Sequence, residues 1–358
     1  MAKIELKNVT YSYNGETNAV EDVNLIFSSE GRYSLLGPSG CGKTTLLKII
    51  AGLLSPDESE ILFDGQDIKD VPVEERDIAM VFQFPVVYPM SVFENLMFPL
   101  RRKKMSKREK EKKALQIADL LEIKPILNEQ ANKLGPADTQ TVALGRALIK
   151  GAAVILLDEP LSSIEPERRT ALKTKIKRIQ EEEKKLFIYV THDQSEALTL
   201  SDIVAVMKDG KILQFDPKEK IYDEPANLFV GYFIGSPGMN ILEGEFKEGK
   251  LNFGDFALPL VPHLKDHLEK HKKFKLGIRP EYVLVSKEER SEWILFTCDE
   301  IEEKGRGVRV LCLKSEKGQS EIKASGSYFD IGEGDKVWIQ FPGDKIRIYD
   351  RESEQIIA

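Results

Sequence analysis

The chain has 358 residues, of which 41% are hydrophobic and 31% are charged, so it can form two domains and is neither disordered nor fibrous. Its net charge of -7 argues against nucleic acid as a partner, because nucleic-acid-binding proteins usually present a positive face. Cys41, Cys298 and Cys312 match no metal-ligand spacing, which fits a reducing compartment. No stretch approaches the roughly 18 apolar residues of a membrane helix, and the N-terminus has no apolar signal region. If the protein works at a membrane, other subunits must span it.

The first part of the chain alternates between strand and helix patterns. Strand-like runs are expected at 4–13, 19–29, 32–37, 152–160, 185–193 and 203–216. Helical patterns are expected at 46–54, 91–148 and 166–185. Strands that alternate with helices predict a mostly parallel sheet covered on both faces, with the long helical stretch as an insertion.

After about Ser236 the pattern changes to short strands separated by Gly and Pro, for example at 274–286 and 335–350. This pattern predicts a separate, small β-barrel-like domain. We therefore expect an α/β domain at 1–235, with a helical subdomain at about 87–150, and an all-β domain at 236–358.

A basic run, RRKKMSKREKEKK at 101–113, holds nine basic and two acidic residues. One interpretation is a solvated helical face or loop. The other is attraction to anionic lipid beside a membrane subunit.

Residues 37–44 match the phosphate-loop pattern G-x-x-x-x-G-K-[ST] between an expected strand and an expected helix. They are Gly37, Pro38, Ser39, Gly40, Cys41, Gly42, Lys43 and Thr44. The glycines let backbone N–H groups curl around phosphate oxygens, and the following helix offers its positive end to the same anion. Lys43 should reach the β- and γ-phosphates, and Thr44 should place its hydroxyl on Mg²⁺.

Residues 154–159, Val-Ile-Leu-Leu-Asp-Glu, form a buried-strand pattern that delivers two carboxylates to the end of a strand, where ligands bind in α/β sheets. Asp158 would hold Mg²⁺ through its water shell, and Glu159 would act as general base on the attacking water. Adjacent acids after a strand are commonly an ordinary turn, so the catalytic interpretation depends on the phosphate loop.

The order of these motifs resembles the ATP-binding cassette (ABC) ATPases. The motifs are the phosphate loop, Gln83 in MVFQFP, the stretch at 132–148, ILLDEP, LSSIEP and THD. The segments at 220–246 and 276–283 look like the maltose-type carbohydrate importer subgroup, whose subunits end in an oligonucleotide-fold regulatory domain. The resemblance covers essentially the whole chain. It implies a P-loop NTPase (RecA-like) cassette with a helical subdomain, followed by an all-β OB-fold (TOBE-like) domain.

The resemblance also implies roles for single residues. Tyr13 matches the aromatic that stacks on adenine, and Tyr11 competes with it because both point the same way on an alternating strand. Gln83 matches the glutamine that senses the γ-phosphate and Mg²⁺ in a loop facing the membrane subunits. His192 in THD matches the switch histidine that contacts the γ-phosphate, although a lone histidine at a strand end is often unremarkable. Thr45 completes the nucleotide-binding segment.

The helix at 136–148 departs from the family where its signature, Leu-Ser-Gly-Gly-Gln, should close over the ATP of the opposite subunit. Alignment through 142–148 puts Leu134, Gly135, Pro136, Ala137 and Asp138 at the five positions. Gly135 lacks the serine hydroxyl, Pro136 lacks an N–H, and Ala137 adds a Cβ. Asp138 is the most adverse, because a carboxylate about 5 Å from a phosphate charge costs roughly 3 kcal/mol per unit charge at an effective dielectric of about 20.

Two smaller departures accompany this one. Thr141 replaces an arginine of the family, and Glu165 in LSSIEP replaces its usual aspartate. The signature stretch still suits a helix start, because Pro136 fits a first turn and Asp138 favours its positive end. A carboxylate at that end also competes with phosphate.

Each nucleotide in this family lies between one chain's phosphate loop and the other chain's signature. The intact Lys43, Asp158, Glu159 and His192 therefore belong to a different site from Asp138. A complete catalytic set is hard to reconcile with two weakened sites in a homodimer. We expect a heterodimer with a second ABC ATPase subunit, whose signature is intact and which can lack its own catalytic Glu or His.

The resemblance thus implies the ATP-hydrolysing subunit of a binding-protein-dependent importer for a sugar or polyol, such as glycerol or glycerol phosphate. It would use ATP and Mg²⁺ at the cytoplasmic face of the membrane, bound to integral permease subunits, with an extracytoplasmic solute-binding protein acting indirectly. The alternatives are a regulatory or scaffold subunit with incidental hydrolysis, an importer ATPase for sulfate or polyamine, and a cassette ATPase on nucleic acid. The acidic charge and the single cassette argue against the last.

Overall fold

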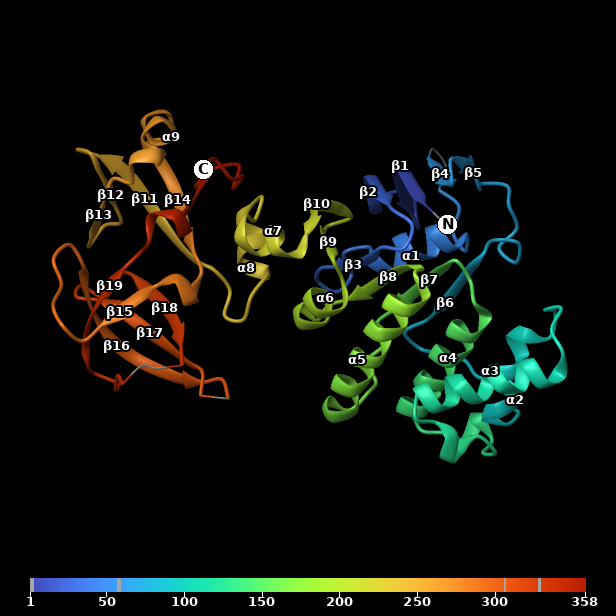
Figure 1. The fold of residues 1–358 in the computed structure, drawn as a ribbon. Coiled ribbons are helices and arrows are strands. Elements are labelled where there is room, and N and C mark those ends of the chain that lie inside the picture. The colour runs from blue at the N-terminus through green and yellow to red at the C-terminus, as the bar shows by residue number, and fades with distance from the viewer. Residues whose placement is uncertain (1–2, 57–58, 306, 328–329) are drawn as a thin grey trace. The chain divides into compact units, whose positions relative to one another are not determined.

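The computed structural model describes residues 3–56, 59–305, 307–327 and 330–358 (Figure 1). The chain divides into two compact units, unit 1 at Met1–Lys218 and unit 2 at Glu219–Ala358. Residues 219–235, which the sequence analysis assigned to the first domain, thus pack with unit 2. Among the described residues, no helix is long and apolar enough to cross a membrane.

A mostly parallel sheet forms the centre of unit 1, with strand order β10-β9-β3-β8-β7-β6. Its strands are β3 (Arg32–Leu36), β6 (Ile78–Val81), β7 (Val154–Asp158), β8 (Leu186–Thr191), β9 (Ile203–Lys208) and β10 (Lys211–Pro217). The pairs among β9, β3, β8, β7 and β6 are parallel, and only β10 runs antiparallel to its neighbour. The predicted sheet is therefore confirmed.

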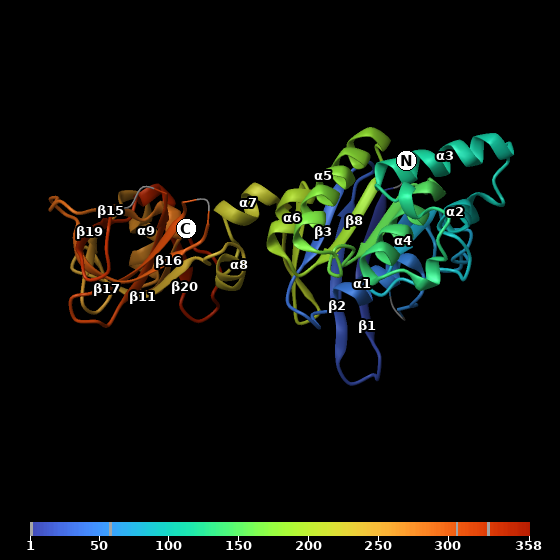
Figure 2. The ribbon, with the colours of Figure 1, turned by 90° about the horizontal axis from the view of Figure 1, so that it is seen from below.

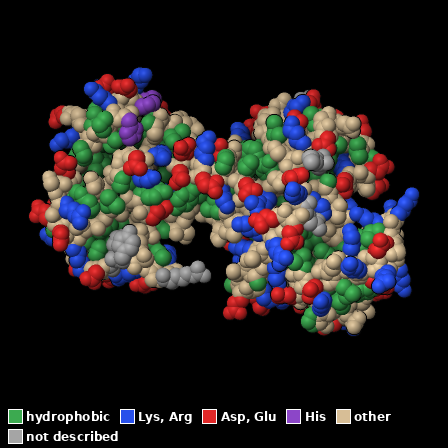
Figure 3. All heavy atoms as spheres, in the orientation of Figure 1, with side chains coloured by type: hydrophobic (Ala, Val, Ile, Leu, Met, Phe, Trp, Pro, Cys, Tyr) green, Lys and Arg blue, Asp and Glu red, His purple; other side chains and the backbone are tan. Residues whose placement is uncertain are grey.

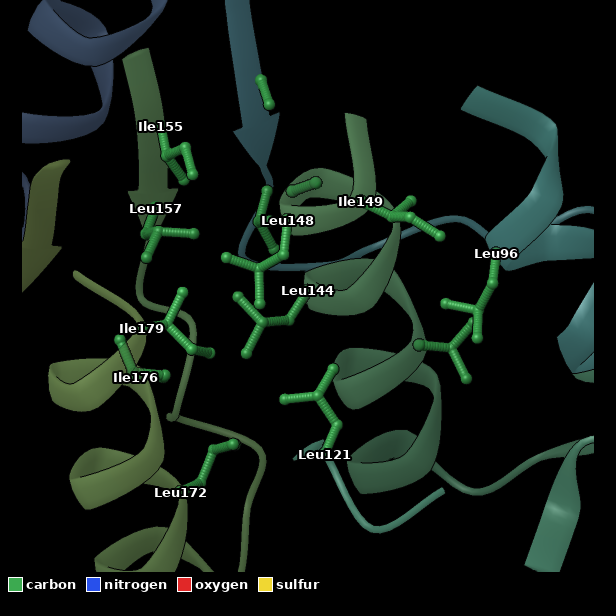
Figure 4. Close-up of a cluster of buried hydrophobic side chains, with 14 of the residues drawn as sticks. Leu96, Leu121, Leu144, Leu148, Ile149, Ile155, Leu157, Leu172, Ile176 and Ile179 are labelled. Atoms are coloured by element: carbon green, nitrogen blue, oxygen red, sulfur yellow. The ribbon is translucent and has the colours of Figure 1, made fainter. Parts of the chain in front are cut away.

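Both faces of this sheet are covered, so successive residues of β7 enter different cores. Ile155 and Leu157 pack with α4 (Pro136–Lys150) and α5 (Pro166–Glu183), as Figure 4 shows. Val154 and Leu156 pack in a second core with α1 (Lys43–Ala51) and a smaller antiparallel sheet (Figure 2). The order of that sheet is β2-β1-β4-β5. Its strands are β1 (Ile4–Ser12), β2 (Asn18–Phe27), β4 (Glu60–Phe63) and β5 (Gln66–Asp67).

The expected helical insertion lies between β6 and β7. It contains α2 (Val92–Met97), η1 (Phe98–Leu100), α3 (Lys107–Leu120), η2 (Lys124–Ile126), η3 (Ala131–Lys133) and α4. The helices α2 and α3 each begin with a capping box, in which a serine and a glutamate satisfy each other's backbone N–H groups. Gly145 lets α4 approach its neighbours, because a Cβ there would lie 2.8 Å from a Leu96 methyl group.

The described part of unit 2 contains two antiparallel sheets, ordered β13-β12-β11-β14-β20 and β15-β19-β16-β17-β18. The first comprises β11 (Asn240–Lys247), β12 (Lys250–Asn252), β13 (Ala257–Pro259), β14 (Lys273–Ile278) and β20 (Arg347–Asp350). The second comprises β15 (Leu284–Ser286), β16 (Ile294–Glu303), β17 (Arg309–Ser315), β18 (Glu321–Gly326) and β19 (Lys336–Gln340). Both sheets contribute to one core, for example through Leu276 and Phe296.

Short helices complete the two units. They are α6 (Gln194–Leu200), α7 (Lys218–Asp223), α8 (Leu228–Phe233), α9 (Lys265–Lys270), η4 (Pro262–Leu264), η5 (Pro280–Tyr282) and η6 (Gly343–Lys345). In unit 2 the buried Arg279 guanidinium donates to the carbonyl oxygens of Gly231, in the last turn of α8, and of Ile234, which caps that helix.

Candidate functional site

The phosphate-loop segment connects the end of β3 to the start of α1 in unit 1. Gly42 directly precedes the helix with φ of 101°, and a Cβ there would lie 2.0 Å from the carbonyl oxygen of Ala19 on β2. Only glycine fits this position, because it tolerates positive φ and has no side chain. The sequence gives no signal that Ala19 lies against the loop.

Lys43 lies across its own loop. Its ammonium group donates to the carbonyl oxygens of Gly37 at 2.8 Å and Pro38 at 2.7 Å. The Cys41 thiol is buried beside it, and this burial raises the pKa of Cys41. The loop therefore already holds a buried positive charge where the sequence analysis expects phosphates.

Thr44 and Asp158 meet at the base of the site. The Thr44 hydroxyl donates to Asp158 Oδ1 at 2.9 Å, joining α1 to the last residue of β7. Burial raises the pKa of the Asp158 carboxyl, and the Thr44 hydrogen bond acts in the opposite direction. A hydroxyl and a carboxylate are hard oxygen ligands of the kind that Mg²⁺ prefers, so this pair fits the expected ion.

Glu159 is held between two residues that follow neighbouring strands. Its Oε2 accepts a hydrogen bond from the Gln83 amide at 3.0 Å, and its Oε1 lies 3.1 Å from His192 Nδ1. Gln83 follows β6 and His192 follows β8, so the carboxyl ends of parallel strands converge at Glu159. The backbone of Glu159 has φ of 44°, which is uncommon for a residue with a side chain and occurs often at functional sites.

Tyr13 forms the rim of a cavity of about 520 Å³ above the loop. The cavity is lined by Tyr13, Ala19, Ser39, Gly40, Gly42, Lys43, Thr44, Thr45, Gln83 and Glu159. Tyr13 is 62% exposed, and its hydroxyl lies 3.2 Å from Thr45 Oγ1. Tyr11 packs edge-on against Tyr13 but does not line the cavity, and neither does His192. Of the two tyrosines, Tyr13 is thus the one that lines the cavity, and its stacking on adenine stays a prediction.

Residues 134–138, which stand at the family's signature positions and are called the rewritten signature below, lead into α4. This agrees with the prediction that they start a helix. Gly135 is the N-cap, Pro136 is the first helical residue, and Asp138 lies in the first turn. Asp138 pairs with Arg168 on α5, whose guanidinium lies 2.9 Å from Oδ1, and no pattern in the sequence predicted this partner. Thr141 is buried and donates to the carbonyl oxygen of Ala137 at 2.8 Å.

Comparison with known proteins finds likenesses for both parts of the chain. The family model described as "ABC transporter" matches residues 20–162, and that of the "MalK OB fold domain" matches residues 235–283. The oligosaccharides import ATP-binding protein MsmX of Bacillus subtilis (strain 168) is 34% identical over 99% of both chains. The trehalose/maltose import ATP-binding protein MalK of Thermococcus litoralis is 36% identical over 100% of both chains.

A solved structure, the ATP-binding cassette MJ0796 in a dimeric post-hydrolysis state bound to ADP and Pi, is similar as well. It is 31% identical, with a TM-score of 0.55, and the likeness covers 60% of this chain and 98% of that one. Together the likenesses confirm the predicted fold class, an α/β phosphate-loop cassette with an OB-fold domain after it.

Proposed function

Because the chain belongs to the family of ABC transporter ATP-binding proteins and is an ATPase, we propose that it is the energy-coupling subunit of a binding-protein-dependent importer. Two relatives are import proteins for oligosaccharides and for trehalose and maltose, which supports a sugar as the solute. A polyol such as glycerol or glycerol phosphate is the further candidate within this proposal. Sulfate or polyamine import is the alternative within the same class. The subunit would work at the cytoplasmic face of the membrane with integral permeases.

The observation that most directly supports this proposal is the convergence of Gln83, Glu159 and His192. Each carboxylate oxygen of Glu159 already has a partner, so this arrangement is a resting one. ATP would draw the Gln83 amide and the His192 imidazole toward its γ-phosphate, which frees Glu159 to accept a proton from the attacking water. When Gln83 exchanges Glu159 for the γ-phosphate, the binding of nucleotide would change the position of the loop that carries Gln83.

The remaining residues bind and orient the nucleotide. Tyr13 offers a flat ring to the base, and Lys43 turns from its loop carbonyl groups toward the phosphates. Thr44 and Asp158, which are hydrogen-bonded to each other, would hold Mg²⁺, with Gln83 as a further ligand. The ion would neutralise charge on the phosphates during transfer.

An apolar groove next to Gln83 is suited to a permease segment. It has a volume of about 460 Å³ and is lined by β6, by residues 85, 86 and 88, by Phe98 and Pro99, and by one face of α4. Val86, which lines the groove, and Phe84, in the same loop beside it, are 81% and 80% exposed. Exposed apolar side chains at a groove mark a protein contact. The loop thus joins the catalytic residue Gln83 to a candidate docking surface.

The signature supports an asymmetric ATPase pair. At these positions the family presents hydrogen-bond donors to the partner's nucleotide. Here Asp138 has a carboxylate instead, and Pro136 has no N–H to donate. This chain's own phosphate loop would then function opposite an intact signature on a second ATPase subunit. A homodimer would instead combine both good phosphate loops with the altered signature.

Two experiments test this function. The first measures Mg-ATPase activity of the purified chain alone and with a second ATPase subunit from the same membranes. Robust cooperative turnover without a partner would contradict the asymmetric pair. The second compares the double variant Phe84→Ser/Val86→Ser with Ile26→Ser, which alters an exposed apolar residue on β2. An energy-coupling subunit should lose solute transport only in the double variant, with ATP binding retained, whereas a regulatory or scaffold subunit would show no such loss.

A further inference from the structure

The basic segment, residues 101–113, concentrates positive charge on the surface of unit 1. Nine basic and two acidic residues give it a formal charge of +7 in a chain whose net charge is -7. Residues 101–104 form the turn after η1, and residues 107–113 form the first half of α3. Figure 3 shows Lys and Arg side chains along the edge of unit 1 where Figure 1 places this turn and α3.

The acidic residues of the segment do not neutralise it. Glu109 accepts hydrogen bonds from the backbone N–H and the hydroxyl of Ser106, both at 2.7 Å, as part of the capping box. Glu111 lies 3.9 Å from Lys107. Five exposed basic side chains form no ion pair or hydrogen bond with the described residues: Arg102, Lys104, Arg108, Lys112 and Lys113.

The segment also borders the apolar groove. The Arg101 guanidinium lies over the Phe98 ring, 4.7 Å from its centroid, and Phe98 lines the groove. Lys110 donates to the carbonyl oxygen of Arg101 at 3.3 Å, which ties α3 to the turn. The free basic groups are therefore fixed beside the face that, by the function proposed above, meets a membrane subunit.

We propose that the basic segment binds the anionic headgroups of membrane lipids beside the permease. Its unpaired, exposed ammonium and guanidinium groups complement a surface of phosphate-bearing headgroups, each contributing roughly fivefold to binding near such a surface. The attraction acts over about 10 Å at 0.1 M salt, so it operates only once the groove brings the segment to the membrane or the chain reaches a bare vesicle. The segment would hold unit 1 against the bilayer and orient it for the permease.

The test uses the full-length purified chain and flotation with two kinds of vesicle, phosphatidylcholine alone and phosphatidylcholine mixed with phosphatidylglycerol. The test variant changes Arg102, Lys104, Arg108, Lys112 and Lys113 to Gln. The control variant changes Lys247, Lys250, Lys270, Lys272 and Lys273 to Gln, which removes the same charge from exposed positions of unit 2. ATP binding by all proteins reports that unit 1 is folded.

We expect the unaltered chain and the control variant to bind the anionic vesicles and not to bind the neutral ones. The test variant should bind anionic vesicles no better than neutral ones, and raising salt to about 1 M, where the screening length is about 3 Å, should release the unaltered chain. Equal binding to both vesicles, or equal losses in the two variants, would overturn the proposal. No vesicle binding by the unaltered chain, with weaker assembly of the test variant on permeases in neutral nanodiscs, would overturn it in favour of an acidic permease segment. Vesicle binding needs neither permease nor hydrolysis, so it fails or succeeds independently of the proposed transport function.

Discussion

The Arg168 guanidinium on α5 donates to the Asp138 carboxylate on α4 at 2.9 Å, so the rewritten signature is tied to a helix that packs on the central sheet. A second ion pair joins Lys175 to Glu122 at 2.5 Å, just after α3. Arg168 and Lys175 are two helical turns apart and lie on one face of α5. A cavity of about 260 Å³ lies between the two pairs. The helical insertion is thus tied to α5 at two points, and one of them exists because of the signature change.

Asp138→Gln restores the family's residue and removes the carboxylate at the helix start. If this carboxylate weakens closure over a second nucleotide, the variant should form an ATP-dependent homodimer that the unaltered chain does not form. The stability cost should be below about 1 kcal/mol, because Asp138 and Arg168 are 30% and 50% exposed and surface ion pairs contribute little. Light scattering after size exclusion, with and without ATP, measures the dimer.

The matched control for that variant is Asp119→Asn, which breaks an exposed ion pair with Lys124 at 2.7 Å in the same helical insertion. It should leave the oligomeric state unchanged. An unaltered chain that dimerises with ATP as well as the Asp138→Gln variant does would contradict the assigned effect of the carboxylate.

Glu159→Gln should retain ATP binding and lower the turnover rate by roughly 10² to 10⁴, the range lost when a general base is removed. The amide keeps the shape of the side chain and can still meet Gln83, but it cannot accept a proton from water. Phosphate release under single-turnover conditions, together with ATP affinity, checks this. Glu167→Gln, at an exposed acidic position in the first turn of α5, is the control and should hydrolyse normally. Similar losses in both variants would argue against a distinct role for Glu159.

Gln83→Ala removes the amide that donates to Glu159 at 3.0 Å. Gln83 also stands at the start of the loop beside the apolar groove. We expect about a tenfold loss of hydrolysis, the equivalent of one hydrogen bond. Beyond this we expect loss of any stimulation by permease, because the side chain is the proposed link between nucleotide and loop. ATPase assays with and without permease in nanodiscs separate the two effects. Gln116→Ala on the exposed face of α3 is the control. Full permease stimulation in Gln83→Ala would exclude the link.

The sequence predicted the parts of the site that local pattern controls. The phosphate loop was recognisable because its glycines and Lys43 stand between a strand and a helix, and the carboxylates because β7 is apolar up to Asp158. The family resemblance, rather than any periodicity, brought Gln83 and His192 to the site. Arg168 and Ala19 were missed because their contacts depend on how α5 packs near α4 and how β2 lies under the loop. Those placements follow from side-chain packing between distant segments, which a single sequence does not encode in its spacing.

Asp158 should make the stability of the nucleotide-free protein depend on pH. Burial raises the pKa of its carboxyl in the folded state above the ordinary value of 3.8, so folding favours its protonated form. The stability is therefore higher below that ordinary value and is lost as pH rises through the raised pKa. Glu196, also buried, has its pKa raised by the same cause and contributes in the same direction. Above the raised pKa the charged Asp158 carboxylate is therefore less favourable to folding than its protonated form, and a bound cation would offset this cost.

Asp158→Asn should accordingly raise the melting temperature of the nucleotide-free protein at pH 7, by about 2–4 °C if the gain is about 1 kcal/mol. The variant should also lose most of the increase in melting temperature that Mg-ATP gives the protein, because the Asp158 carboxylate is the proposed partner of the ion. Calorimetry with and without Mg-ATP at pH 7, and without nucleotide across the acidic range, measures both effects. The exposed Asp266→Asn in unit 2 serves as a control that should change neither. A lower melting temperature for Asp158→Asn at pH 7 would mean that the carboxylate stabilises the empty site, and the proposed neutralisation by Mg²⁺ would then be wrong.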